Sequence, residues 1–177
     1  MRLIDGTPKV DRRSFLASTG AAALVVTSTS VICPTESWGV EAQNLKPETV
    51  RTLIRMSRDI YPHDRFADRF YAVAVKGMDG KATEGAPLKA TLEDGVAKLD
   101  EAAKAAHGVP YADVGWEHQR VALLRAIEGD PFFQTVRGDL VVSLYNQKEL
   151  WPMFGYQGES ASKGGYIKRG FNDIDWL

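Results

Sequence analysis

The residues best suited to chemistry, by type and by spacing, lie together at Tyr61-Pro62-His63-Asp64, with Asp68 shortly after them. A histidine beside carboxylates can act as a general base, because its ordinary pKa lies near neutral pH. The same stretch also has a structural interpretation, in which Pro62 ends one helix, Asp64 caps the next and His63 lies on the surface. We favour the structural interpretation and keep a small hydrolase or isomerase that uses His63 and Asp64 as a rival hypothesis.

No second site of this kind is indicated by the sequence. His63, His107 and His118 are scattered, and none of them pairs with another at the short spacing typical of metal ligands on a helix. The glycine-rich motifs that bind dinucleotides and phosphates are absent, as are the haem-attachment, zinc-protease and serine-hydrolase motifs. We therefore expect no cofactor, metal ion or catalytic residue in this chain.

An export leader is indicated by the sequence DRRSFLASTGAAALVV, which begins at Asp11. Arg12, Arg13, Phe15 and Leu16 match the pattern that directs proteins to the twin-arginine route, whose cargo crosses the membrane already folded. A chance arginine pair in an N-terminal tail is the alternative interpretation. We expect a periplasmic protein that is exported by the twin-arginine route.

The leader is predicted to comprise residues 1–42. Its apolar run, residues 17–32, is diluted by Ser, Thr and Gly and is shorter than the roughly 20 residues of a spanning helix. A small-residue cleavage pattern follows at Val40-Glu41-Ala42. Cys33, the only cysteine, lies inside the leader, so cleavage leaves no thiol for a disulfide, a haem or an iron–sulfur cluster. An uncleaved leader would instead anchor the protein to the membrane.

The sequence after the leader predicts one helical domain. About 135 residues remain, and the whole chain carries 22 basic and 23 acidic side chains, which gives no indication of nucleic acid or of an anionic membrane as partner. Apolar residues recur at helical spacing and show no β-type alternation. We expect an all-α fold, a small bundle of about five helices within residues 43–149. The expected helices run from about 46 to 61, 64 to 78, 87 to 107, 115 to 128 and 132 to 146 or 149, with a polar link at 77–85.

The C-terminal segment, residues 150–177, is rich in glycine and aromatic residues and has no helical period. One interpretation is a strap that completes the core of the bundle. The other is a partner-binding segment, because Trp, Tyr and Phe are enriched at the centres of interfaces. A strap can also offer its outer side to a partner. The candidate partner-binding residues are Trp151, Phe154, Tyr156, Tyr166, Phe171 and Trp176.

Three sets of residues, in this order after the twin-arginine leader, resemble a known family. They are Ile60-Tyr61-Pro62-His63-Asp64 at a helix end, a helix from Phe132-Phe133 to Leu144-Tyr145-Asn146, and a closing Gly164-Gly165-Tyr166-Ile167 with Gly170-Phe171. Together they resemble the gluconate 2-dehydrogenase subunit 3 family over most of the chain after the leader. The chain departs from that pattern in its long ending and in lacking a cysteine beyond the leader, which leaves no disulfide to a partner.

The resemblance implies a non-catalytic small subunit of a periplasmic dehydrogenase complex for sugars or alcohols. Such a subunit stabilises a large FAD-containing dehydrogenase subunit of the glucose-methanol-choline type and escorts it through twin-arginine export. FAD is then expected in the partner subunit, where it is inserted before export. The resemblance also implies a multihaem cytochrome c subunit as a further partner, and membrane association through the complex. A free-standing periplasmic helical ligand-binding protein is the alternative function.

Overall fold

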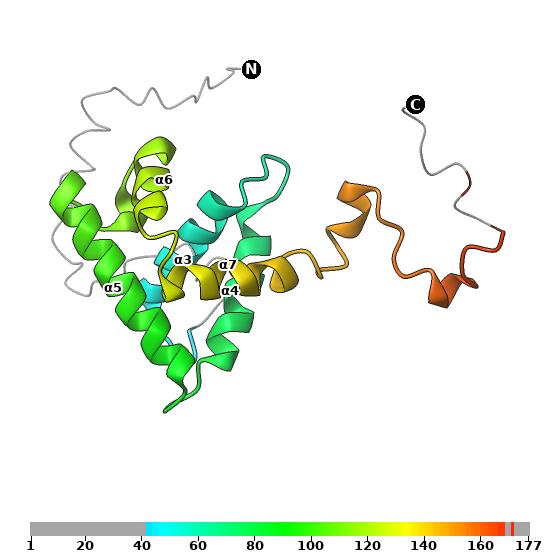
Figure 1. Cartoon of the computed structure of the whole chain (residues 1–177), viewed down its shortest axis with the longest axis horizontal. Coiled ribbons are helices and arrows are strands. Elements are labelled where there is room, and N and C mark those ends of the chain that lie inside the picture. Colours follow the sequence, from blue (N-terminus) through cyan, green and yellow to red (C-terminus); the bar gives the residue numbers. More distant parts are fainter. Residues whose placement is uncertain (1–41, 169–170, 172–177) are drawn as a thin grey trace, which may run out of the picture. The chain divides into compact units, whose positions relative to one another are not determined.

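The computed structural model describes residues 42–168 and residue 171 of the chain. Over these residues the fold contains five α-helices and no strand, which confirms the predicted small all-α bundle of about five helices (Figure 1). Three short 3₁₀ helices lie between and after them: η1 (Tyr111–Asp113), η2 (Trp151–Phe154) and η3 (Ala161–Lys163). The α-helices are α3 (Pro47–Ile60), α4 (Asp68–Lys81), α5 (Pro87–His107), α6 (Glu117–Ala126) and α7 (Pro131–Ser143).

Proline and glycine set several of the helix boundaries. Pro47, Pro87 and Pro131 each occupy the first turn of a helix, where the missing N–H has no intrahelical partner to lose. The carboxylate of Asp130 caps α7 by accepting a hydrogen bond from the Phe132 N–H at 2.8 Å. Gly108 ends α5 in the left-handed conformation, with φ of 77°. These signals explain why the predicted bounds of α5 agree with the structure.

Helix α3 is the centre of the bundle. It packs against α4, α5, α6, α7 and η1, and its ribbon lies among the other helices in Figure 1. A helix that packs against several elements has a wide buried face rather than one narrow stripe. The buried residues of α3 are apolar and polar in equal number: Thr49, Val50, Thr52, Leu53, Ile54, Met56, Ser57 and Asp59.

A buried ion pair joins Asp59 of α3 to Arg120 of α6. The Arg120 Nε and Nη2 atoms donate to the two carboxylate oxygens of Asp59 at 2.7 and 2.8 Å, and the Tyr111 hydroxyl donates to the same carboxylate at 2.8 Å. The Arg120 Nη1 atom donates to the carbonyl oxygens of Val114 and Gly115. Burial beside Asp59 raises the pKa of Tyr111, and the hydrogen bonds that Arg120 donates to Asp59 raise the pKa of Arg120. Both groups therefore keep their protons.

Helix α4 begins and ends later than the spacing of its apolar residues predicts. The expected range was about 64 to 78, whereas the helix runs from Asp68 to Lys81. The turn before it is held by the Phe66 N–H, which donates to the His63 carbonyl, and by burial of the Phe66 ring. Asp64 is therefore not a helix cap, and the predicted link at 77–85 is helical up to residue 81.

The ends of α6 and α7 also differ from the sequence prediction. Trp116, expected on the apolar face of a helix from residue 115, precedes α6 in an extended conformation and is 69% exposed. Helix α7 ends at Ser143 because the Gln147 side chain donates to the carbonyl oxygens of Phe70 and Ser143 and the chain turns there. Val141, predicted on the core face of α7, is half exposed. Its neighbour Leu140, predicted on the same face, is fully buried.

The contact between α5 and α7 depends on a glycine. A methyl group placed on Gly95 would lie 2.2 Å from Cγ and 2.8 Å from Cβ of Phe132. The ring of Phe132, only 3% exposed, therefore packs directly on the backbone of α5. Gly138, inside α7, has open space where its methyl group would be.

We expect Gly95→Ala to lower the free energy of unfolding by about 1–3 kcal/mol, the usual cost of overpacking. Gly138→Ala is the matched control and should raise the same quantity by about 0.5–1 kcal/mol, because alanine favours the helix. Urea denaturation of both variants measures the difference. Equal stabilities would contradict the packing of Phe132 on Gly95.

We expect Arg120→Ala to lower the free energy of unfolding by about 3–5 kcal/mol, because it leaves the Asp59 carboxylate buried without its cation. Arg69→Ala is the control, since Arg69 pairs with Glu149 through side chains that are 61% and 72% exposed. Removing an exposed pair costs about 1 kcal/mol or less. If Arg120→Ala lowered the free energy of unfolding by only about 1 kcal/mol, as expected for the control, the core would accommodate the unpaired carboxylate and the expectation would be contradicted.

Candidate functional site

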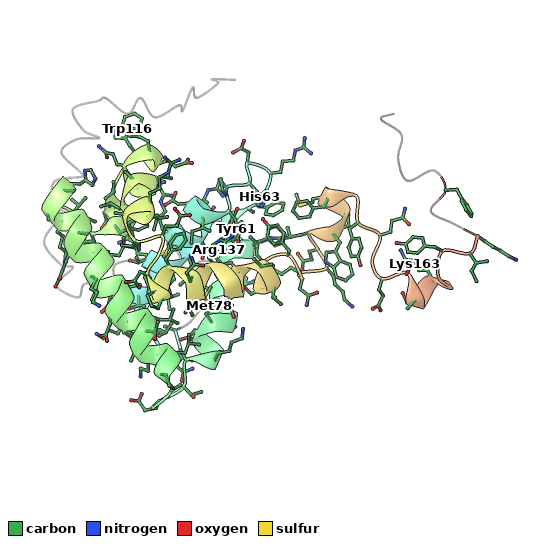
Figure 2. All side chains as sticks on the ribbon, in the orientation of Figure 1. Tyr61, His63, Met78, Trp116, Arg137 and Lys163 are labelled. Atoms are coloured by element: carbon green, nitrogen blue, oxygen red, sulfur yellow. The ribbon has the colours of Figure 1, made fainter. Side chains whose placement is uncertain are left out.

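The candidate site is the region where the C-terminal segment leaves the bundle. It is built from the loop after α3, the turn after α7, and η2. Figure 2 labels Tyr61, His63 and Arg137 in this region, and the Tyr61 hydroxyl donates to the Arg137 carbonyl at 3.4 Å. The region therefore joins segments that are about 80 residues apart in the sequence.

His63 lies inside an aromatic cage. Its Nε2 atom is 2.7 Å from the Tyr145 hydroxyl, within hydrogen-bond distance. Its ring centroid lies 4.4 Å from that of Phe66, 5.6 Å from that of Tyr145 and 5.7 Å from that of Phe154. Burial lowers the pKa of His63 below its ordinary value of 6.5, so the imidazole is neutral at pH 7. The cage connects the end of α3 to the first turn of the C-terminal segment.

Tyrosine hydroxyls hold the loop beneath the cage. The Tyr71 hydroxyl donates to the Tyr61 carbonyl at 2.6 Å and accepts from the His63 N–H at 3.2 Å. Burial raises the pKa of Tyr71 and of Tyr145, which keeps both phenols protonated. Because Tyr71 is fully buried in α4, it fixes the backbone that carries His63.

The acid–base hypothesis placed His63 beside carboxylates, whereas in the structure its ring lies beside the phenol of Tyr145. Asp64 is exposed and makes no hydrogen bond or ion pair with any described residue. Asp68 pairs with Arg58 at 2.8 Å. Without a carboxylate to orient the ring, the general-base arrangement is not formed among the described residues. His63 itself is half-buried.

The root of the C-terminal segment is anchored by Leu150 and Trp151. Leu150 is fully buried, and the Trp151 indole N–H donates to the Tyr145 carbonyl at 3.1 Å. The Trp151 ring lies 5.1 Å from that of Tyr156, and the Lys148 ammonium lies 5.9 Å from the Trp151 ring. Trp151, predicted to bind a partner, is thus half-buried and contributes contacts within the chain.

Beyond this root the apolar side chains are exposed. Phe154 and Tyr156 are each 48% exposed, and Ile167 and Phe171 are 84% and 79% exposed. Tyr166 is also exposed. Met153, in η2, and Ile167 extend the predicted set, and the sequence could have shown them as the apolar neighbours of Phe154 and Tyr166. We call the exposed residues Met153, Phe154, Tyr156, Tyr166, Ile167 and Phe171 the apolar arm.

Two groups of predicted site residues lie outside the described residues. Trp176, the last candidate of the C-terminal segment, is one of them. The export residues Arg12, Arg13, Phe15 and Leu16 form the other group. Their predicted roles remain predictions.

Three further features bear on function. No group of three or more metal-ligating side chains gathers within residues 42–168 and 171, and no helix there is long and apolar enough to cross a membrane. A groove of about 370 Å³ lies between α5 and the start of α7. Its lining includes Thr91, Asp94, Lys98, Asp130 and Phe132.

Comparison of the chain with family models, curated proteins and solved structures finds no match. The resemblance to the gluconate 2-dehydrogenase subunit 3 family therefore remains a prediction from the sequence. The aromatic cage, the anchored root and the apolar arm are the observations on which a functional proposal can be built.

The cage predicts a pH dependence of stability. His63 has a lower pKa in the folded chain than in the unfolded chain, so the unfolded chain takes up the proton more readily. The free energy of unfolding should therefore fall as the pH drops from about 7 through the pKa of folded His63. His63→Gln should remove this part of the pH dependence, as measured by urea denaturation at several pH values.

His118→Gln is the matched control, because His118 is exposed and lies beside the exposed Trp116 ring. It should leave the pH profile of the natural chain unchanged. Identical profiles for His63→Gln and His118→Gln would contradict the cage.

Proposed function

We propose that this protein is the non-catalytic small subunit of a periplasmic FAD-dependent dehydrogenase complex for sugars or alcohols. In this proposal it stabilises the large flavoprotein subunit and escorts it through twin-arginine export. The single observation that carries the proposal is the apolar arm, which leaves six large apolar side chains exposed in one stretch of 19 residues. The order of motifs in the sequence supports the choice of partner.

The area of the arm is large enough to matter for binding. Aromatic side chains bury about 150–250 Å² when fully enclosed, so a half-exposed ring still offers on the order of 100 Å². At about 25 cal/mol per Å², burying one such ring contributes roughly 2–3 kcal/mol before the costs of association. Large exposed apolar side chains gathered in one segment are typical of a site of interaction with another protein.

The root of the arm lowers the cost of docking. Trp151 and Leu150 are fixed in the bundle, and Phe154 is held against His63 and Phe66. The arm therefore leaves the bundle in a fixed direction. Because of this, less conformational freedom is lost when a partner binds it. In the complex, the flavin of the partner would carry out the redox chemistry, and this chain would supply binding surface.

A second function, a free-standing helical ligand-binding protein, is favoured by one observation, the groove between α5 and α7. Its lining combines apolar side chains with Asp94, Lys98 and Asp130, as in sites for small polar ligands. This function predicts a stable monomer that needs no partner.

The test is purification of the chain with a tag in the exposed link after α4, at residues 83–85, when it is expressed together with its native gene neighbours. We expect a larger protein to copurify with the absorbance spectrum of a flavin. A colourless protein that purifies alone would favour the ligand-binding function.

The arm itself is tested by Ile167→Asp and Phe171→Asp. Both side chains are more than three-quarters exposed, so these substitutions should leave the bundle folded. We expect each to weaken the complex by about 2 kcal/mol, roughly 30-fold in affinity, as measured by titration of the purified subunits. Trp116→Ser, at the exposed aromatic residue before α6, is the control and should bind normally. Unchanged affinity in both arm variants would exclude the arm from the interface.

A further inference from the structure

A buried carboxylate on α4 holds the residues that precede α3. Asp79 is 1% exposed. Its Oδ2 atom accepts a hydrogen bond from the backbone N–H of Gln43 at 2.8 Å. Its Oδ1 atom accepts from the N–H groups of Asn44 and Leu45 at 3.0 and 2.8 Å. The Asn44 side chain returns a hydrogen bond to the Asp79 carbonyl at 2.8 Å. We call this arrangement the Asp79 clasp.

The electrostatic setting of Asp79 is unfavourable for a carboxylate that meets only neutral donors. Asp79 lies in the last turn of α4, where the aligned peptide dipoles place partial negative charge. No Lys, Arg or His of the described part of the chain forms an ion pair with it. Buried carboxylates are ordinarily paired with a cation as well as hydrogen-bonded. The site thus has the geometry and the field to accept a positive charge.

One atom already in the clasp can carry that charge. The nitrogen of Gln43 is an amide while Ala42 precedes it, and it becomes an α-ammonium group if the bond between these residues is cut. The small-residue pattern at Val40-Glu41-Ala42 predicts a cut at this bond, from the sequence alone and without reference to Asp79. Ala42 packs at the edge of the core and Gln43 is exposed, so the bond between them lies near the surface of the bundle.

We propose that Asp79 is the binding site for the new N-terminal ammonium group of Gln43, which is formed when the leader is removed after Ala42. Hydrolysis breaks the Ala42–Gln43 peptide bond with one water molecule, leaves a carboxylate on Ala42, and leaves an amine on Gln43 that takes up a proton. The neutral N–H contact at 2.8 Å then becomes a charge-assisted hydrogen bond to Oδ2. Removal of the leader thereby strengthens the clasp that orders the start of the mature chain.

The neighbouring contacts support this assignment. The Lys46 N–H donates to one carboxylate oxygen of Glu93 at 2.8 Å, and the Thr49 hydroxyl donates to the other at 2.7 Å. The chain is therefore held on both sides of Leu45, which is itself buried. Hence the Gln43 nitrogen keeps its place opposite Asp79 when the residues before it are gone.

The proposal is tested on the full chain, and the test involves no partner subunit. A site-specific protease sequence is placed before Gln43 so that the folded chain can be cut between residues 42 and 43. The matched control is cut one residue earlier, before Ala42, which puts the ammonium group out of reach of Asp79. We expect the chain cut at Gln43 to melt at a higher temperature than the uncut chain at about pH 6, and the control to show no such gain.

The pH dependence gives the sign of the effect. An ammonium group held by a carboxylate has a pKa above the roughly 8 of a free α-amine. The added stability is therefore present below the unfolded pKa of roughly 8 and is lost as the pH rises above it through the folded pKa. Asp79→Asn, cut in the same way, should show no gain. Because this variant removes a buried group, acylation of the Gln43 amine in the natural chain provides a second readout, expected to be at least about tenfold slower at pH 7 than in the control.

Three results would overturn the proposal. One is resistance of the 42–43 bond to the protease while the bond before Ala42 is cut, because the clasp would then protect the bond. Another is equal amine reactivity in the two cut chains. The last is an exported protein whose first residue, by mass spectrometry, is not Gln43 or is Gln43 cyclised with loss of ammonia, since a cyclised residue carries no charge. A free Gln43 terminus in the exported protein supports it.

Discussion

The buried ion pair between Asp59 and Arg120 is the constraint on which the rest of the structure depends. Removing two charges from water costs several kcal/mol per ion, and only good geometry with further hydrogen bonds can offset that cost. Here both carboxylate oxygens and all three guanidinium nitrogens have partners, including the Tyr111 hydroxyl. A pair of apolar side chains could stabilise the core as well, but the planar fork of an arginine fits one orientation of α6 against α3. We therefore infer that this ion pair selects one packing of α6 on α3 over similar packings of the same two helices.

The position of the candidate site follows from that choice. Asp59 is the penultimate residue of α3, and Tyr61 and His63 come directly after it. The face of α3 that meets Arg120 thus fixes the direction in which the chain leaves the helix, and with it the place of the imidazole. Because His63 contacts Tyr145 and Phe154, the root of the apolar arm takes its orientation from the same helix. The loop after α3 thus joins the core to the arm, in addition to the anchored root at Leu150 and Trp151.

The sequence predicted the helices better than it predicted the contacts between them. Helical periodicity with proline and glycine boundaries was sufficient for α3 and α5, because these signals act within one turn. The sequence placed Trp116 wrongly inside a helix, because a residue just before a helix can share the spacing of the residues on its apolar face. Its extended backbone, which directs the side chain to solvent, leaves no signal in that spacing. The exposed aromatic residues of the arm were predicted by type alone.

Contacts that join distant residues could not be predicted. His63 and Tyr145 are 82 residues apart, and no residue pattern predicts the contact between the imidazole and the phenol hydroxyl. Asp79 lay in a polar stretch that looked like a link, and its partners are backbone N–H groups 34 to 36 residues away, which any residue type supplies. A buried side chain that binds backbone leaves no signal in its partners' sequence. The clasp and the cage are alike in this respect. Each holds a segment at one end of the bundle through a polar residue, Asp79 or His63, whose position in the sequence is typical of an exposed residue. Chemistry at the two ends of this domain is therefore visible only once the fold has brought those residues to their partners.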